Sequence, residues 1–320
     1  KDNLTVDAIL TLPALASANS LGGSKAIVID GVVPTITSVT STTADGSYNT
    51  TGNINITVNF SEAVTLAGGN MTVALDTGGT VTIPTFSGTS AAGIYTPATG
   101  QNSTDLNSTG ITLATGATLK DAAGNNATLT IPTGQSLANS KAIVVDTIAP
   151  TVDLTSTSAP TVNSKFNVTA TFSENVTGFD NTDLTVANGT VGNFVIVDAK
   201  TYTFDVTPTA DGIVTVDVPV AKATDTASNN NTAATQLTRT ADRTPPTASL
   251  GAISNITTAG GTSQTLTVTF SDNSGVDVTS LDNSDLVVNW SGGTILTTFV
   301  SVDNNSNGTP RIATYSLTPP

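Results

Sequence analysis

Carboxylates are the side chains in this sequence best suited to metal chemistry, because it contains neither Cys nor His. The absence of Cys and His excludes disulfides, metal sites built from thiolate or imidazole, and nucleophiles paired with imidazole. The acids recur in three motifs: Phe-Ser-Glu or Phe-Ser-Asp, a loop of the type Asp-Ala-Ala-Gly-Asn, and an Asp shortly before a Pro-Thr pair. Carboxylates held close together repel one another, and a divalent cation removes that repulsion. Calcium is the best candidate because it takes about six to eight oxygen ligands in flexible geometry.

An internal repeat places these motifs along the chain. Residues 136–146, SLANSKAIVVD, nearly repeat residues 20–30, SLGGSKAIVID, and Pro-Thr pairs follow the two copies at Pro34 and Pro150. A third Pro-Thr pair begins at Pro246. Motifs that recur in the same order predict a tandem array of modules. Its predicted parts are the tail of a preceding module or a donor strand at 1–33, a first module at 34–149, a second at 150–245, and a C-terminally incomplete third at 246–320.

The apolar residues alternate in the manner of strands. Residues 53–60 read NINITVNF and residues 264–270 read QTLTVTF, which predicts strands with one buried face. Modules of about 100 residues with short strands, frequent turn signals and no helical pattern favour a β-sandwich. We therefore expect an all-β protein made of tandem immunoglobulin-like antiparallel β-sandwiches.

The motifs resemble those of bacterial Ig-like domains, which occur in tandem in large surface adhesins. The resemblance is carried by the Phe-Ser-Glu or Phe-Ser-Asp motif, the Asp-Ala-Ala-Gly-Asn loop, and the linker DTIAPT at residues 146–151, and it covers essentially the whole chain. It implies a non-catalytic structural or adhesive protein that is extracellular or on the cell surface. Such modules also occur in surface layers and as spacers in secreted enzymes, so the resemblance leaves the biological role open.

The sandwich topology brings the three acidic motifs together. The linker, the loop after the second strand and the loop before the last strand return to the same end of a module, here called its pole. We predict that calcium binds at each pole and stiffens the array into a rod, in the manner of cadherin-like repeats. The predicted ligands, module by module, are Asp30, Glu62, Asp121 and Asn125; Asp146, Glu174, Asp225 and Asn229; and Asp242 and Asp272. The alternative is that each Asp is a turn residue before Pro and each Glu a solvated strand cap.

Glycosylation is a second predicted feature. Asn-x-Ser/Thr sequons are more frequent than the composition predicts, and N-linked glycans would require a host with the necessary enzymes. Strands rich in Asn and Thr also generate sequons without any selection for glycans. The candidate sites are Asn55, Asn102, Asn107, Asn167, Asn255 and Asn304.

Charge and composition limit the partners. The net charge of −14 disfavours binding to nucleic acid or to an anionic membrane surface, and no apolar run approaches the length of a membrane span. Aromatic residues make up only 4% of the chain, so no platform for a sugar substrate is expected beside a pair of acids, and we predict no catalysis. The expected partners are copies of the chain or neighbouring repeats, with cell-surface glycans or proteins as further candidates.

Three roles remain open at this point. The first is a rod that projects an adhesive tip, and the second is a self-assembling surface-layer or filament subunit. The third is a set of spacer domains in a larger secreted enzyme. Head-to-tail strand exchange would suit the second role, with residues 25–30 as the donor strand and the third module as the acceptor. The competing interpretation is that the sequence is a window onto a longer tandem array.

Overall fold

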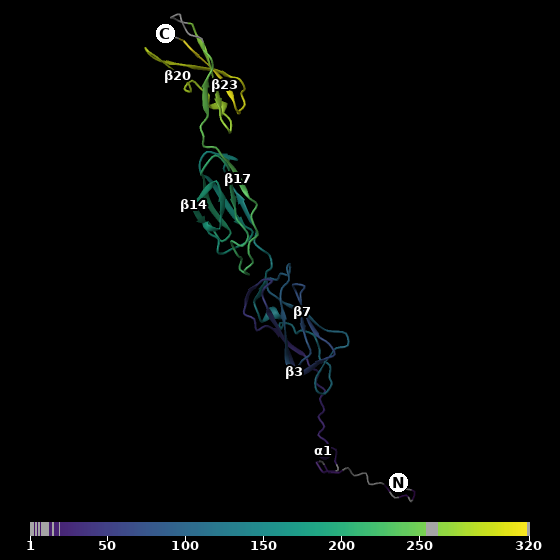
Figure 1. Ribbon diagram of the computed structural model, residues 1–320. Coiled ribbons are helices and arrows are strands. Elements are labelled where there is room, and N and C mark those ends of the chain that lie inside the picture. The colour runs from purple at the N-terminus through teal and green to yellow at the C-terminus, as the bar shows by residue number, and fades with distance from the viewer. Residues whose placement is uncertain are drawn as a thin grey trace. The chain divides into compact units, whose positions relative to one another are not determined.

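The computed structural model describes residues 20–253 and 262–318, together with residues 3, 5, 7, 13, 14 and 16–18. The chain divides into two compact bodies, residues 1–148 and 149–320. Strands dominate both bodies, and helical structure is limited to single short turns, which confirms the all-β prediction (Figure 1). Among these described residues there is no helix whose length and apolar character would let it cross a membrane.

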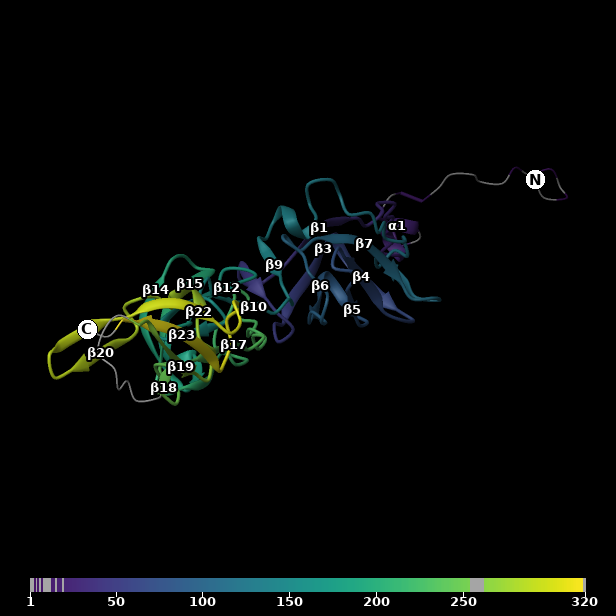
Figure 2. The ribbon, with the colours of Figure 1, turned by 90° about the horizontal axis from the view of Figure 1, so that it is seen from above.

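The first body contains the sandwich of the first module (Figure 2). One sheet has the order β1 (Ile36–Thr40), β3 (Ile54–Ala67) and β6 (Ser87–Tyr95), with β8 (Thr118–Lys120) also paired to β3. The other strands are β4 (Met71–Leu75) between β5 (Thr80–Ile83) and β7 (Ser108–Leu113), and β2 (Gly46–Tyr48) beside β9 (Ile143–Val145). All these pairs are antiparallel except β2 with β9. Side chains from both groups of strands form one hydrophobic core.

The alternating pattern of residues 53–60 produces this core directly. Ile54, Ile56 and Val58 on β3 are fully buried, while the residues between them are partly exposed. Further along the same strand, the pairing with β6 is irregular between Asn59 and Val64. The Phe-Ser-Glu motif lies in this irregular stretch, so the local break in the ladder places an acidic residue at the pole of the module.

The second body contains the second and third modules, which have separate hydrophobic cores. In the second module, one sheet has the order β10 (Val152–Thr155), β12 (Phe166–Phe172), β15 (Thr201–Pro208) and β14 (Gly189–Ile196). The other sheet has the order β11 (Thr161–Val162), β17 (Leu237–Ala241), β16 (Gly212–Asp217) and β13 (Thr185–Ala187). In the third module, β18 (Thr247–Leu250), β19 (Gln264–Ser271), β23 (Arg311–Leu317) and β22 (Thr298–Val302) form a sheet, and β20 (Val287–Trp290) pairs with β21 (Gly293–Leu296).

The second and third modules differ in how their first strand is covered. Leu154 pairs with Ala170 and Leu250 pairs with Val268, so the two leucines hold the same place in the register. Leu154 is 6% exposed, whereas Leu250 is 53% exposed. Within residues 262–318 the second layer of the third module is represented by the β20–β21 hairpin. Leu154 belongs to the hydrophobic core of the second module, whereas Leu250 lies outside the core cluster found among the described residues of the third.

Candidate metal site

The Phe-Ser-Glu motif is anchored by the Pro-Thr pair that starts each module. The N–H of Thr35 donates to Oγ of Ser61 at 2.9 Å, and the N–H of Ser61 donates to the carbonyl of Thr35 at 2.9 Å. Thr151 and Ser173 exchange the same two hydrogen bonds, at 3.0 and 2.9 Å. In the sequence these residues stand out only as members of two recurring motifs. Their pairing explains why the two motifs recur together, because each fixes the position of the other.

The acidic loop of the first module is organised by its own carboxylate. Oδ1 of Asp121 accepts hydrogen bonds from the N–H of Gly124 at 2.7 Å and of Asn125 at 2.8 Å. Oδ2 accepts from Nδ2 of Asn125 at 2.7 Å. Gly124 has φ of +98°, a left-handed conformation that suits glycine. The motif Asp-Ala-Ala-Gly-Asn therefore encodes a tight loop that buries its Asp, which is 9% exposed.

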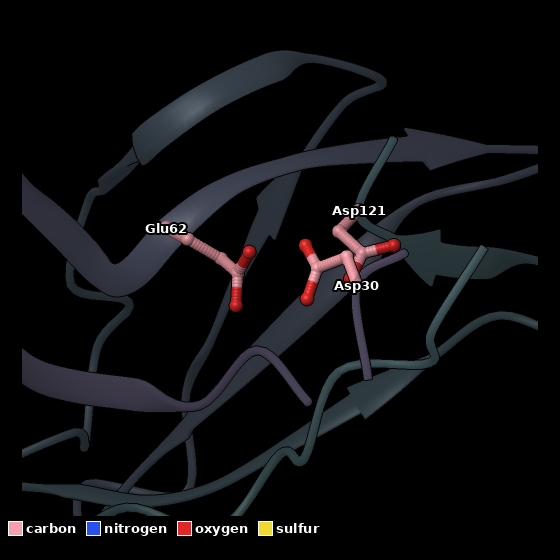
Figure 3. A group of neighbouring side chains, drawn as sticks. All are labelled: Asp30, Glu62 and Asp121. Atoms are coloured by element: carbon pink, nitrogen blue, oxygen red, sulfur yellow. The ribbon is translucent and has the colours of Figure 1, made fainter. Parts of the chain in front are cut away.

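Three carboxylates converge at this pole, as the sequence predicted. Asp30, Glu62 and Asp121 each offer one carboxylate oxygen, and these oxygens lie within 4.8 Å of one another. Figure 3 shows the three side chains pointing toward a common space, with Glu62 facing the other two. Nδ2 of Asn125 donates to the backbone carbonyl of Asp30 at 3.1 Å, which ties the incoming chain to the loop. All four predicted ligands of the first module thus lie together.

The negative charges of the carboxylates at this pole repel one another. Burial raises the pKa of Glu62, and the negative charges of Asp30 and Asp121 raise it further. Burial also acts against ionisation of Asp121, but the hydrogen bonds from Asn125 and Gly124 outweigh it and hold the Asp121 pKa below its usual value. At neutral pH the pole therefore concentrates negative charge, and a bound cation would relieve the repulsion.

The second module builds the same loop with a different residue at the left-handed position. Asp225 accepts hydrogen bonds from the N–H and Nδ2 of Asn229, both at 2.8 Å, and Ser228 has φ of +67°. Glu174 and Asp225 offer carboxylate oxygens within 4.8 Å of each other. Three predicted ligands of the second module therefore lie together: Glu174, Asp225 and Asn229.

Asp146 lies in the first body, close to its last residue. Its Oδ1 accepts a hydrogen bond from the N–H of Ile148 at 3.0 Å. In the repeat it corresponds to Asp30, since residues 136–146 match residues 20–30. This hydrogen bond closes the kind of turn expected if Asp146 is a turn residue before the proline. Metal binding by Asp146 stays a prediction.

The acidic residues of the third module have different neighbours from those of the first two modules. Asp242 lies beside Asp272. Oδ1 of Asp272 accepts hydrogen bonds from the N–H and the hydroxyl of Ser274, at 2.8 and 3.0 Å. The Ser274 N–H has the largest effect on the pKa of Asp272 and lowers it. Across residues 20–253 and 262–318, no third carboxylate joins these two in a close group.

Asp211 lies near this pair. Its carboxylate accepts hydrogen bonds from the hydroxyl of Thr244 and from the N–H of Arg243. These two bonds lower the pKa of Asp211, while the negative charge of Asp272 acts in the opposite direction. Asp211 therefore anchors the linker residues Arg243 and Thr244 by accepting hydrogen bonds from them.

The predicted glycosylation sites occupy varied environments. Asn102, Asn167 and Asn304 are exposed, and Asn55 and Asn107 are half-buried. Asn255 lies outside the described residues. Each of the five described side chains accepts at least one hydrogen bond through Oδ1, which leaves Nδ2, the atom that carries an N-linked glycan, on the other side of the amide. Glycosylation at these positions stays a prediction.

One buried residue of the second module was not singled out from the sequence. Asn231 is fully buried. Its Oδ1 accepts from the N–H groups of Lys222 and Ala223, and its Nδ2 donates to the carbonyls of Pro219 and Thr232. It stands third in a run of three Asn residues, and the run itself does not reveal which member is buried. Its satisfied hydrogen bonds identify it as a structural residue that shapes the acidic loop.

A family model matches part of the chain. Residues 146–241 match the family model described as a bacterial Ig-like domain, which confirms the resemblance predicted from the motifs. A search of curated proteins finds no match. Among solved structures, the chain is similar to invasin, a bacterial integrin-binding protein, at 12% identity and a TM-score of 0.30, covering 89% of this chain and 54% of that one. The chain thus spans about half the length of that protein.

Proposed function

We propose that this chain serves as a structural or adhesive repeat array on the cell surface or outside the cell, because residues 146–241 match the family model of a bacterial Ig-like domain. The modules have separate hydrophobic cores and repeat the same anchoring motifs, as expected of a repeat protein that provides reach rather than catalysis. Adhesion would require a partner at one of the modules. A cell-surface protein or glycan is the class of partner that this role requires.

The carboxylate cluster of the first pole carries the finer part of the proposal, which is calcium binding. Asp30, Glu62 and Asp121 supply three closely spaced oxygens, and carboxylate oxygens are ligands that calcium prefers. Backbone carbonyls and water would complete the usual six to eight ligands. Extracellular calcium modules bind with dissociation constants of about 0.1 to 1 mM, so a site of this kind would be occupied in calcium-rich surroundings.

Calcium at this pole would restrain the chain that enters the module. Asp30 belongs to the incoming segment, whereas Glu62 and Asp121 belong to the module itself. A cation bound to all three would fix the incoming segment to the pole. We propose that the repeat extends this arrangement to Asp146, Glu174 and Asp225, so that calcium stiffens successive linkers and the array becomes a rod.

Small-angle X-ray scattering with calcium and with a chelator tests this proposal. Calcium is expected to increase the maximum dimension of the chain and to narrow the distribution of interatomic distances. The double variant Glu62→Gln/Glu174→Gln should give the chelated profile under both conditions. Asp205→Asn, which alters a β15 residue paired with Asn167 at the end of β12 far from Ser173, should behave as the parent. Identical profiles with calcium and with chelator would contradict calcium stiffening.

A second candidate role is self-assembly into a filament or surface layer. It is favoured by exposed apolar residues at Leu21, Ile27 and Ile29. Sedimentation velocity over a range of protein concentrations tests it: concentration-dependent assembly supports this role, and a single monomeric species throughout the range contradicts it.

A further inference from the structure

Two strand pairs of the molecule are parallel, and each joins an early strand of a module to its last strand. Among the strand pairs of residues 20–253 and 262–318, β2 pairs in parallel with β9, β11 pairs in parallel with β17, and the others are antiparallel. Only β1 precedes β2 in the first module, and only β10 precedes β11 in the second. The chain therefore enters each module shortly before one strand of the pair and leaves it directly after the other.

The leaving chain is bonded into each parallel pair at its last position. The N–H of Asp146 donates to the carbonyl of Tyr48 at 3.0 Å. The N–H of Asp242 donates to the carbonyl of Val162 at 2.9 Å. Both aspartates are the linker acids that precede a Pro-Thr pair. Because each linker begins at the residue that closes the pair, tension on the linker acts first on these backbone hydrogen bonds.

The parallel direction decides how tension loads the two strands. Tension on the entering chain pulls β2 or β11 toward its N-terminal end, and tension on the leaving chain pulls β9 or β17 toward its C-terminal end. Because the two strands run the same way, these pulls are opposed along one axis, which is shear. The hydrogen bonds between the strands then share the load and break together. An antiparallel pair in the same place would be pulled from one end and would open one bond at a time.

The first strand of each module lies ahead of the parallel pair. β1 is hydrogen-bonded to β3, and β10 is hydrogen-bonded to β12. Tension that detached β1 or β10 would release only the residues ahead of β2 or β11. The rest of the module stays closed until the parallel pair separates.

The parallel pair of the first module is reinforced by side chains. Nζ of Lys141 lies 3.0 Å from Oδ1 of Asp45, and the N–H of Ala142 donates to the same oxygen at 3.2 Å. These bonds join the chain just before β2 to the chain just before β9. Ile143 and Val145 of β9 are fully buried. Sliding of β9 along β2 would therefore break an ion pair and move apolar side chains out of the core.

The parallel pair of the second module is shorter and less buried. Thr161 lies opposite Thr240, and both are exposed. Val162 is half-buried and lies opposite Ala241, which is buried. The pair between β2 and β9 has a third position as well. Fewer backbone contacts and less apolar burial therefore hold the second pair together.

We propose that the two parallel pairs are mechanical clamps that let the array bear tension, and that the second module yields before the first. The inference deepens the structural role proposed above and rests on it, because only a chain held at both ends comes under tension. Unfolding of the second module would lengthen such a chain and limit the force on it. The first module and its pole would stay folded meanwhile.

The first experiment pulls the first module in two directions with optical tweezers. Because the chain has no Cys, pairs of introduced cysteines fix the points where DNA handles attach. Gly31→Cys with Ile148→Cys applies force where the chain enters and leaves the module. Ala44→Cys with Asn139→Cys applies it just ahead of β2 and β9, at the same end of the clamp. All four positions are exposed.

The two pairs of handles should give different unfolding forces. At one loading rate, the entry and exit handles should require at least about twice the force of the other pair, because forced unfolding follows the unfolding barrier and shear breaks the clamp bonds together. The released length, at most about 3.6 Å per residue, shows in each recording that the module was folded. Equal forces in the two directions would overturn the proposal.

The second experiment pulls the first two modules in series, through Gly31→Cys and Pro245→Cys. The first module, 34–149, is longer than the second, 150–245, by about 20 residues, so its unfolding releases roughly 7 nm more length. The shorter increment should come first in most molecules. If the longer increment comes first, or if either comes first equally often, the second clamp is not the weaker one and the proposed order is wrong.

Both experiments are made in chelator, so that they are independent of calcium binding at the poles. A chain that shows no calcium stiffening in the scattering test can still show the difference between the two pulling directions. Equal forces in the two directions would likewise leave the scattering test unchanged. The clamp and the calcium-stiffened rod can therefore fail separately.

Discussion

The first and third modules carry the same motif, within β3 in one and at the end of β19 in the other, yet its acidic residue has opposite properties in the two places. Burial and the nearby charges of Asp30 and Asp121 raise the pKa of Glu62. The pKa of Asp272 is lowered, chiefly because the N–H of Ser274 donates to it. The motif alone therefore produces a turn cap. It becomes a candidate cation site where the linker and the acidic loop add two further carboxylates.

The same two modules also differ in the burial of an equivalent core position. Val39 pairs with Val58 and is fully buried, whereas Leu250 pairs with Val268 and is half exposed. Val39→Ala should lower the free energy of unfolding of the first module by about 2 kcal/mol, through lost burial and a cavity. Leu250→Ala should change it in the third module by less than about 0.5 kcal/mol. Chemical denaturation followed by residue-specific NMR measures both, and equal losses would remove the distinction between the two cores.

Removing the loop carboxylate should have the largest effect on calcium affinity. Asp121→Asn keeps the size of the side chain but removes one charged ligand and the acceptor for Nδ2 of Asn125. We expect calcium affinity at the first pole to fall by roughly tenfold to a hundredfold, since it loses both a ligand and its support. Isothermal titration calorimetry measures the change. Unaltered affinity would show that Asp121 only shapes its loop.

Glu62→Gln and Asp272→Asn form a matched pair at equivalent positions. We expect Glu62→Gln to weaken calcium binding at the first pole by about tenfold, because one charged ligand is lost. Asp272→Asn should leave that affinity unchanged within about twofold. The two variants are compared in the same calorimetric titration. Equal effects would contradict the different roles assigned to the two residues.

The smallest expected effect is a difference in titration between these two acids. In metal-free protein, Glu62 should titrate above its ordinary pKa of 4.5 and Asp272 below its ordinary pKa of 3.8. Acidification through the raised pKa of Glu62 should relieve repulsion and favour the folded state, whereas acidification through the lowered pKa of Asp272 should remove stabilisation. Carboxyl ¹³C chemical shifts report both midpoints. Added calcium should lower the Glu62 midpoint, because the metal binds the ionised form.

The sequence predicted the strand pattern and the first pole for clear physical reasons. Alternating apolar residues at 53–60 can bury only one face, and β3 buries Ile54, Ile56 and Val58. The grouping of Asp30, Glu62 and Asp121 followed from topology, because loops at one end of a sandwich meet. The three acidic motifs, which recur in the same order along the chain, were sufficient to predict this grouping of carboxylates.

Other features depended on tertiary contacts that a sequence pattern does not specify. The paired hydrogen bonds between Thr35 and Ser61 require two residues far apart in sequence to meet. In the first module β5 pairs with β4, whereas in the second module β14 joins the other sheet through β15. β5 follows β4 in the chain as β14 follows β13, so the order of the strands alone does not assign them to a sheet. The use of Asp272 as a turn cap likewise depends on Ser274, two residues later.

A crystal structure of the chain with calcium tests the central claim most directly. At about 10 mM calcium, a site of millimolar or tighter affinity should be filled, with density at about 2.3 to 2.6 Å from oxygens of Asp30, Glu62 and Asp121. We expect this density at the first pole and none between Asp242 and Asp272. A first pole without a cation under these conditions would contradict it.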